Sequence, residues 1–336
     1  MKRLQFATSV VLGLTMATGA WAQGKGEAVK FQDYPGIGNM LVRVAINKGY
    51  CDKYGINCEL QMIPSGPLGA QALLAKSIDA GLFPAEVMVG AVLKGAKMRM
   101  VVGGATAHPG ILIAGNHTET PNAQKGWPAF MHDFKGKKIG VTTRGAFVEQ
   151  IATSMLIKAG MKAEDVTFVA VGGPNTAYGA LISKQVDAIM MFEPAGAMCT
   201  VLGTCKVIWR GAEDKLPAEQ HALNGGGSGQ AFTQDYIDRN PHVIEAVIKA
   251  VKDADSFINN PANVEELVTI ANSFFKFDMP RGDEVLREAL RRHLVAKAYS
   301  APINRNSVKV GLDFLVETGQ IDRAPPASEF VYDKAP

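Results

Sequence analysis

The sequence is short of the residues and motifs that catalytic metals, nucleotides and nucleic acids require. Its six histidines are scattered over 336 residues and form no cluster, so no metal site is expected. The formal net charge of +3 is too small to indicate a nucleic-acid-binding protein. Gly36 and Gly38 begin a dinucleotide fingerprint, but Leu41 stands where its third glycine belongs, and no phosphate loop occurs. We therefore expect no cofactor and no nucleic acid among the partners.

Long apolar runs are also missing, except at the N-terminus. Lys2 and Arg3 precede an apolar core, residues 6–16, that is too short to span a bilayer. Ala20-Trp21-Ala22 then fits the small-x-small cleavage pattern of a secretory signal. Residues 1–22 are therefore predicted to be a signal peptide that is cleaved after Ala22, and the mature chain is expected to be exported.

Cysteine is scarce as well, with four residues in two close pairs. Cys51 and Cys58 are seven residues apart, and Cys199 and Cys205 are six residues apart. Pairing within each neighbourhood is the simplest of the three possible connectivities, and each bridge would stabilise the fold by roughly 2–3 kcal/mol. We expect two disulfides, and the alternative is four buried thiols. Zinc fits less well, because neither pair has the Cys-x-x-Cys spacing.

Short apolar strands alternate with amphipathic helices over the first two thirds of the chain. This order predicts an α/β fold with a largely parallel sheet. Residues 72–80 (ALLAKSIDA) align with residues 180–188 (ALISKQVDA) at a constant offset, so Ala, Leu, Lys, Asp and Ala coincide. The match predicts two similar βαβαβ units. After about residue 231 the pattern changes, and helices dominate the C-terminal part.

A strand, a polar turn and a helix follow one another around residues 138–159. In open α/β sheets, ligands bind beyond the carboxyl ends of the strands, where such turns lie. A helix N-terminus there offers unpaired N–H groups. Together with Thr142, Thr143 and Arg144 it predicts a cradle for a small anion. The alternative is that Thr143 only caps the helix and that Arg144 points to water.

The same rule selects turn residues in both repeated units as candidate ligand contacts. They are Tyr34, Asn39, Ser65, Gly66, Phe83 and Glu86 in the first unit, and Asn175, Tyr178, Phe192 and Glu193 in the second, beside the cradle. Each has a structural alternative. The aromatic residues would suit a core, the small polar residues often serve their own turns, and the acid before Pro194 would suit a structural role.

Several motifs along the chain resemble those of a known family. They are Ile46-Asn47-Lys48-Gly49-Tyr50 with Lys53-Tyr54-Gly55-Ile56, Ser77-Ile78-Asp79-Ala80, residues 133–141 (DFKGKKIGV), Val186-Asp187-Ala188 before Glu193-Pro194, and Asn240-Pro241-His242-Val243-Ile244. Their order and spacing resemble periplasmic substrate-binding proteins of ABC transporters, in the nitrate/sulfonate/taurine (NitT/TauT) group. That group is similar in fold to the thiamine-precursor-binding proteins.

The resemblance implies a two-lobe type II periplasmic binding protein with a hinge and a helical C-terminal extension. Residues 23–106 and 220–336 would form lobe I, and residues 107–215 would form lobe II. The chain would cross between the lobes near residues 104–109 and 211–224. An ABC permease in the inner membrane would be the protein partner, and the binding protein would act as a monomer in the periplasm.

The resemblance also implies a function without catalysis, in which the lobes capture a small molecule. Arg144 favours a small organic anion, either a sulfonate or a carboxylate. Alternative ligands are a pyrimidine or thiamine precursor, or a zwitterion such as taurine whose amine would face Glu193. A further alternative is a secreted enzyme on the same fold, with Glu86 and Glu193 as its acid/base pair. A sensory role is not separable from transport by sequence.

Overall fold

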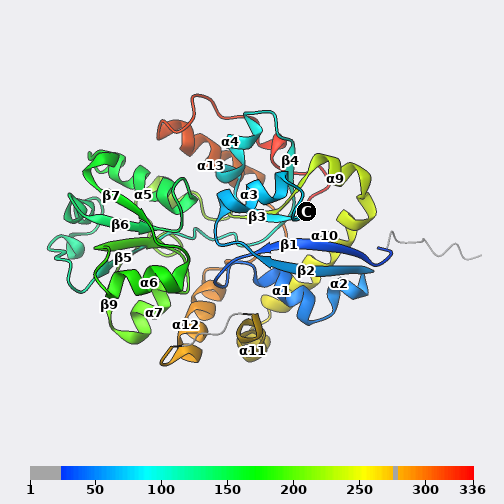
Figure 1. The fold of residues 1–336 in the computed structure, drawn as a ribbon, viewed down its shortest axis with the longest axis horizontal. Helices are drawn as coiled ribbons and strands as arrows, with labels where there is room; N and C mark the ends of the chain where they lie inside the picture. The colour runs from blue at the N-terminus through cyan, green and yellow to red at the C-terminus, as the bar shows by residue number, and fades with distance from the viewer. Residues whose placement is uncertain (1–23, 275–278) are drawn as a thin grey trace, which may run out of the picture.

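The computed structural model describes residues 24–274 and 279–336, so the predicted signal peptide lies outside the described residues. Figure 1 shows two lobes in which helices flank β-strands. Lobe I has a two-stranded and a three-stranded sheet, and lobe II has one sheet of five strands. No helix in the described ranges is both long and apolar enough to cross a membrane. The two lobes confirm the predicted α/β architecture.

Lobe I contains the first strands of the chain and one that returns late in the sequence. Its strands are β1 (Glu27–Asp33), β2 (Ile56–Met62), β3 (Gly81–Phe83), β4 (Met98–Gly103) and β10 (Gly229–Thr233). β1 pairs with β2 in parallel, and a bridge between Phe31 and Ala80 joins this pair to the β3 edge. β10 lies between β3 and β4 and is antiparallel to both.

Lobe II repeats this arrangement. Its strands are β5 (Ile111–Gly115), β6 (Lys138–Val141), β7 (Thr167–Ala170), β8 (Ala188–Met191) and β9 (Cys205–Arg210). They lie in the order β7-β6-β8-β5-β9, and β5 is antiparallel to β8 and β9. In each lobe the antiparallel strand is the one that has just crossed from the other lobe. The largely parallel sheet predicted from the sequence is therefore interrupted by one antiparallel strand in each lobe.

The two lobes share the local geometry of the repeat found in the sequence. Lys76 and Lys184 both adopt a left-handed conformation, with φ of 60° and 63°. The carboxylates of Asp79 and Asp187 each accept a hydrogen bond from a backbone N–H 49 residues earlier, at 2.9 and 2.8 Å. Each aspartate thus ties the end of one βα unit to the neighbouring strand. These matched contacts confirm the predicted repeat.

The helices cover the sheets in the order expected for a βα alternation. They are α1 (Met40–Asn47), α2 (Tyr50–Lys53), α3 (Gly66–Leu74) and α4 (Ala85–Val92) in lobe I, α5 (Phe147–Lys158), α6 (Pro174–Ile182) and α7 (Ala195–Leu202) in lobe II, and α8 (Ala218–His221) after β9. The C-terminal part adds α9 (Gln234–Arg239), α10 (Pro241–Ile258), α11 (Val264–Phe274), α12 (Gly282–Val295) and α13 (Arg305–Glu317).

The C-terminal helices divide between the two lobes. α10 buries a stripe that runs through Val243, Val247 and Ala254, with residues three or four apart as helix packing requires. It packs against α1, as α11 does, while α13 packs against α4. α12 packs against α11 and also contacts α7 of lobe II, where Met198 belongs to the same apolar cluster as Leu286. The helical extension therefore reaches lobe II through α12, in addition to its packing on lobe I.

Two chain segments connect the lobes and run side by side. Residues 104–110 lead from β4 to β5, and residues 211–228 lead from β9 back to β10. Backbone N–H groups of Gly225 and Ser228 donate to carbonyls of the first segment at 2.8 and 2.7 Å. A third segment near Ala298 accepts a hydrogen bond of 2.6 Å from the first. The connection between the lobes is therefore a narrow, hydrogen-bonded ribbon.

The cysteines follow the prediction in part. Cys51 and Cys58 form a disulfide that joins α2 to β2, as predicted. Cys199 and Cys205 are free thiols in the structure, so the second predicted disulfide is wrong. Interaction with the neighbouring Cys205 thiol, together with burial, holds the pKa of Cys199 above its ordinary range.

Candidate functional site

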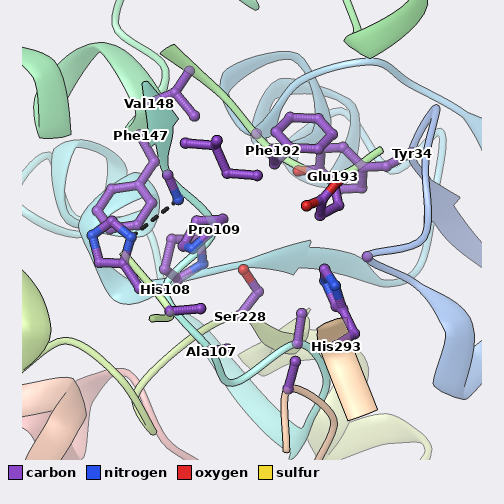
Figure 2. A pocket seen from close by; sticks show the side chains of 18 of the residues that line it. Tyr34, Ala107, His108, Pro109, Phe147, Val148, Phe192, Glu193, Ser228 and His293 are labelled. Atoms are coloured by element: carbon purple, nitrogen blue, oxygen red, sulfur yellow. Dashed lines mark hydrogen bonds between the residues drawn. The ribbon is translucent and has the colours of Figure 1, made fainter. Parts of the chain in front are cut away.

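A cavity of about 140 Å³ lies between the lobes. That is many times the volume one water needs, so it suits a small molecule. Its walls come from both lobes, from the connecting segments and from α12 (Figure 2). The polar and aromatic lining residues are Tyr34, Ser65, Thr142, Phe147, Phe192, Glu193, Arg210, Glu213, Ser228, Arg292 and His293.

Several helices begin at the cavity. The first residues of α3 and α5 line it, as do Pro84 directly before α4 and Glu193 two residues before α7. A helix N-terminus carries unpaired N–H groups and a partial positive charge, which favour an anion. Glu193 already occupies the start of α7, because its Oε2 accepts the N–H of Ala197 at 2.9 Å. α3 carries no acidic residue in its first turn and no side-chain cap, so its N-terminus is available to a ligand.

Ser65 stands directly before α3 and faces the same cavity. The residue is only 2% exposed, and its hydroxyl has no hydrogen-bond partner within the part of the chain that the structure describes. Buried hydroxyls are nearly always paired, because an unpaired one loses its bonds to water without replacement. A ligand oxygen at the N-terminus of α3 would supply the missing partner.

A buried ion pair forms the wall of the cavity on the side of lobe II. The Glu193 carboxylate accepts a hydrogen bond from the Arg210 guanidinium, and both residues are buried. Arg210 also donates to the Thr200 hydroxyl at 3.3 Å. A Cβ on Gly196 would lie 2.5 Å from Arg210, so glycine is required there to admit the pair. The arginine is therefore already neutralised and held in place.

The remaining charged lining residues are paired too. Arg292 of α12 donates to Glu213 at 2.6 Å and to Glu288 at 2.7 Å. Glu213 also lies 3.8 Å from the Arg210 Nε atom. The charges that line the cavity in the described residues thus balance one another.

His293 faces the cavity from α12, opposite Glu193 (Figure 2). Its Nδ1 lies 3.2 Å from the Ala289 carbonyl oxygen, so Nδ1 carries the proton and donates. Burial lowers the pKa of His293, which keeps the ring neutral. The other ring nitrogen is then a hydrogen-bond acceptor.

Aromatic rings supply the apolar surface of the cavity. Tyr34 of lobe I and Phe192 of lobe II meet edge to face with their centroids 6.5 Å apart. Tyr34 donates its hydroxyl proton to the Leu82 carbonyl at 2.9 Å, which fixes the ring. Phe147 lies on the other side, near His108. The cavity therefore offers aromatic contacts to a ligand whose polar group sits at Ser65.

The structure brings together six of the residues predicted from the sequence as ligand contacts. Tyr34, Ser65, Gly66, Thr142, Phe192 and Glu193 line the cavity.

The other candidates lie elsewhere. Phe83 is a fully buried core residue, and the Asn39 amide is used up between the Gln32 carbonyl and the Gln230 amide. Tyr178 bonds Thr204, and Asn175 is exposed. Glu86 lines a different cavity.

Arg144 and Thr143, two residues of the predicted anion cradle, do not line this cavity. The Arg144 side chain is 65% exposed and pairs with Glu149 at 2.9 Å. Glu149 also accepts the Gly145 N–H at 2.8 Å. A carboxylate of the chain itself therefore fills the place that the sequence suggested for a ligand anion.

Several lining residues were missed by sequence reasoning. Arg210 ends β9, Glu213 and Ser228 lie in the segment 211–228 that connects the lobes, and Arg292 and His293 lie on α12. Of these residues, only Ser228 lies in a recognisable sequence pattern, the glycine-rich run Gly226-Gly227-Ser228-Gly229. The run resembles a nucleophile elbow, but Gln230 stands where the last glycine of that motif belongs.

Comparisons with known proteins agree with this architecture. Residues 36–272 match the NMT1-like family. A protein from Brucella abortus (strain 2308) whose name calls it a binding protein is 30% identical over 244 residues, which cover 72% of this chain and 69% of that protein.

Solved structures share the fold at lower identity. The periplasmic aliphatic sulphonate-binding protein SsuA from Escherichia coli aligns with a TM-score of 0.66 and 18% identity, covering 91% of this chain and 92% of its own. The periplasmic nitrate-binding protein NrtA from Synechocystis PCC 6803 aligns with a TM-score of 0.71 and 15% identity, covering 90% and 84%. The chain belongs to the NMT1-like family and has the two-lobe fold of periplasmic binding proteins.

Proposed function

We propose that this protein is an extracytoplasmic solute-binding protein that captures a small organic anion between its lobes and delivers it to an ABC permease. The observation that carries the proposal is the cavity between the lobes, where the N-terminus of α3 and the unpaired Ser65 hydroxyl meet. Both favour the oxygens of a sulfonate or carboxylate. The sulfonate- and nitrate-binding proteins of the same fold support this choice.

Ligand binding would act by shifting the balance between arrangements of the two lobes. Ser65 belongs to lobe I and Thr142 to lobe II, so a ligand that touches both stabilises the arrangement in which they are close. The segments 104–110 and 211–228 are the natural hinge, because they connect the two sheets. The permease would recognise the closed form.

The export route and the monomeric state belong to the same proposal. Residues 1–22 have the features of a signal peptide, and the Cys51–Cys58 disulfide suits an oxidising compartment such as the periplasm.

The alternative function, a secreted enzyme, would need Glu86 and Glu193 as an acid/base pair. Glu86 lines another cavity, however, and Glu193 is neutralised by Arg210. Transport without catalysis is therefore the better proposal.

A neutral heteroaromatic ligand, such as a pyrimidine, is the second candidate. The observation that favours it is the balance of charge around the cavity, combined with the Tyr34–Phe192 ring pair. An uncharged ring would use the aromatic contacts and would need no partner ion.

The experiment is a thermal-shift screen of residues 23–336 against sulfonates, carboxylates, nitrate and pyrimidines. A ligand at one hundred times its Kd adds about 2.7 kcal/mol of stability, which gives a readily measured shift. We expect the shift with an organic sulfonate or carboxylate. A shift with pyrimidines alone would contradict the anion proposal and support the second candidate.

A further inference from the structure

A second cavity, of about 700 Å³, lies beside the first. Its walls come from α3, α4 and α13 of lobe I and from the start of α5 in lobe II, elements that Figure 1 shows around one side of the interlobe region. Val87 lines both cavities and so separates them. Much of the wall is apolar, with Leu74, Val89, Leu315 and Ile321 among its residues.

Glu86 gives this cavity a buried carboxylate. The residue is 7% exposed and forms no ion pair with any described residue, and its carboxylate accepts a hydrogen bond from its own backbone N–H. Gly311 of α13 leaves the room that the carboxylate occupies, because a Cβ there would lie 2.1 Å from Oε1. Burial raises the pKa of Glu86 to about 7. A buried acid that has no cation beside it is costly to ionise unless a positive charge binds there.

A second acceptor lines the cavity from the opposite lobe. The Gln150 Oε1 atom of α5 is buried and has no hydrogen-bond partner among residues 24–274 and 279–336. Lys94 is the other charged residue of the lining. It lies eight residues after Glu86, about 12 Å farther along the direction of α4, and it is exposed. The lining of this cavity therefore favours a ligand that donates hydrogen bonds and carries a positive charge.

We propose that this cavity is a second binding site, for a small organic ammonium ion with an apolar body. The ammonium N–H groups donate to the Glu86 carboxylate and to Gln150 Oε1, and the hydrocarbon part packs on the apolar wall. A metal ion is a poorer occupant, since no group of three or more His, Cys, Asp or Glu suited to a metal occurs in the described chain. The site is separate from the one proposed for the transported solute.

The test is calorimetric titration of residues 23–336 with n-butylammonium chloride and with 1,4-diaminobutane at pH 8. Butan-1-ol and tetramethylammonium chloride are the control probes, because the first has no charge and the second has no N–H. We expect saturable binding of the two amines and at least tenfold weaker binding of both controls. Equal binding of butan-1-ol would show an apolar cavity only and would overturn the proposal.

Variants separate the site from the rest of the molecule. Glu86→Gln keeps the shape and removes the charge, and it should weaken amine binding at least tenfold. Glu164→Gln, at an exposed carboxylate of lobe II, should leave it unchanged. Gln150→Leu removes the second acceptor without touching lobe I and should also weaken binding. Amine affinities that are unaffected by both cavity variants would refute the assignment.

The number of protons released when an amine binds tests whether the Glu86 carboxylate takes part in binding. At pH 6 an ammonium ion binds the ionised form of Glu86, so binding should release protons, seen as a heat that depends on the buffer. Glu86→Gln should abolish this dependence while leaving any thermal shift by the transported anion intact. Loss of the anion response alone would count against the proposed function and not against this second site.

Discussion

Glu193 and Arg210 form an ion pair inside the wall of the interlobe cavity, with side chains that are 4% and 8% exposed. The pair joins the turn after β8 to the end of β9, so two neighbouring parts of lobe II depend on it. Because both charges are out of water, each relies on the other. This relationship explains why Arg210 lies in the wall of the cavity and yet offers no uncompensated positive charge to a ligand.

Replacing Arg210 with methionine should destabilise the protein strongly, because Glu193 would remain buried without its cation. Loss of one partner of a buried pair costs about 3–5 kcal/mol. Arg144→Met is the matched control, since Arg144 is exposed in its pair with Glu149 and should change stability by less than about 1 kcal/mol. Urea unfolding of the two variants measures the difference. Similar small losses in both would contradict the structural role of Glu193–Arg210.

His108 should make the stability fall in acid. Its Nε2 lies 2.8 Å from Gln220 Oε1 and its Nδ1 accepts the Gly110 N–H at 3.0 Å, so the ring is held neutral. Burial lowers the pKa of His108 from 6.5 to about 4. The folded state thus resists protonation, and the stabilisation present above pH 6.5 is lost as the pH falls toward 4, by on the order of 3 kcal/mol.

The check is the free energy of unfolding of wild type and His108→Gln at pH 7.5 and pH 4.5. The variant should lose less stability between the two values, whatever its stability at pH 7.5. Parallel losses in both proteins would show that His108 does not carry the acid sensitivity.

Glu86 should have the opposite pH dependence. Its pKa rises to about 7 in the folded protein, against 4.5 as its ordinary value. The folded state therefore holds a proton that the unfolded state has lost, and stability declines as the pH rises from about 4.5 to about 7. Glu86→Gln should remove this decline and be more stable than wild type at pH 8, by about 1–3 kcal/mol. Chemical denaturation at pH 4 and pH 8 measures it, and a variant less stable at pH 8 would contradict the account.

The Cys51–Cys58 disulfide should be the one bridge of the described chain, and it should stabilise the fold. Replacing Cys51 and Cys58 with serine should cost about 2–3 kcal/mol, because the unfolded chain gains freedom. The unfolded, unreduced protein should react with two equivalents of a thiol reagent, from Cys199 and Cys205. An absence of reactive thiols would restore the second disulfide that the sequence suggested.

Much of the fold was predictable because its signals are local. The Lys76 and Lys184 turns and the Asp79 and Asp187 contacts repeat in the sequence as they do in space. β5 and β10, which follow the crossings, and β9, which pairs with β5, were not predicted, because antiparallel pairing between distant segments depends on contacts made far along the chain. The position of α12 against both lobes likewise has no local signal.

The site was predictable only where it follows the strand-end rule. Ser65, Thr142 and Glu193 lie directly after strands or before helices, and the rule found them. The same rule also selected Arg144, which does not line the cavity because its guanidinium pairs with Glu149 in the first turn of α5. It also could not find His293, whose place depends on the packing of a helix from the C-terminal part of the chain.

The central claim is that a small organic anion binds between the lobes and touches both. Calorimetric titration of the anion found in the screen against wild type, Ser65→Ala and Thr142→Val tests it most directly. Both variants should bind at least tenfold more weakly, about 1.4 kcal/mol each, with unfolding free energies unchanged, while Arg144→Ala should bind as wild type does. Wild-type affinity in both Ser65→Ala and Thr142→Val would contradict the claim.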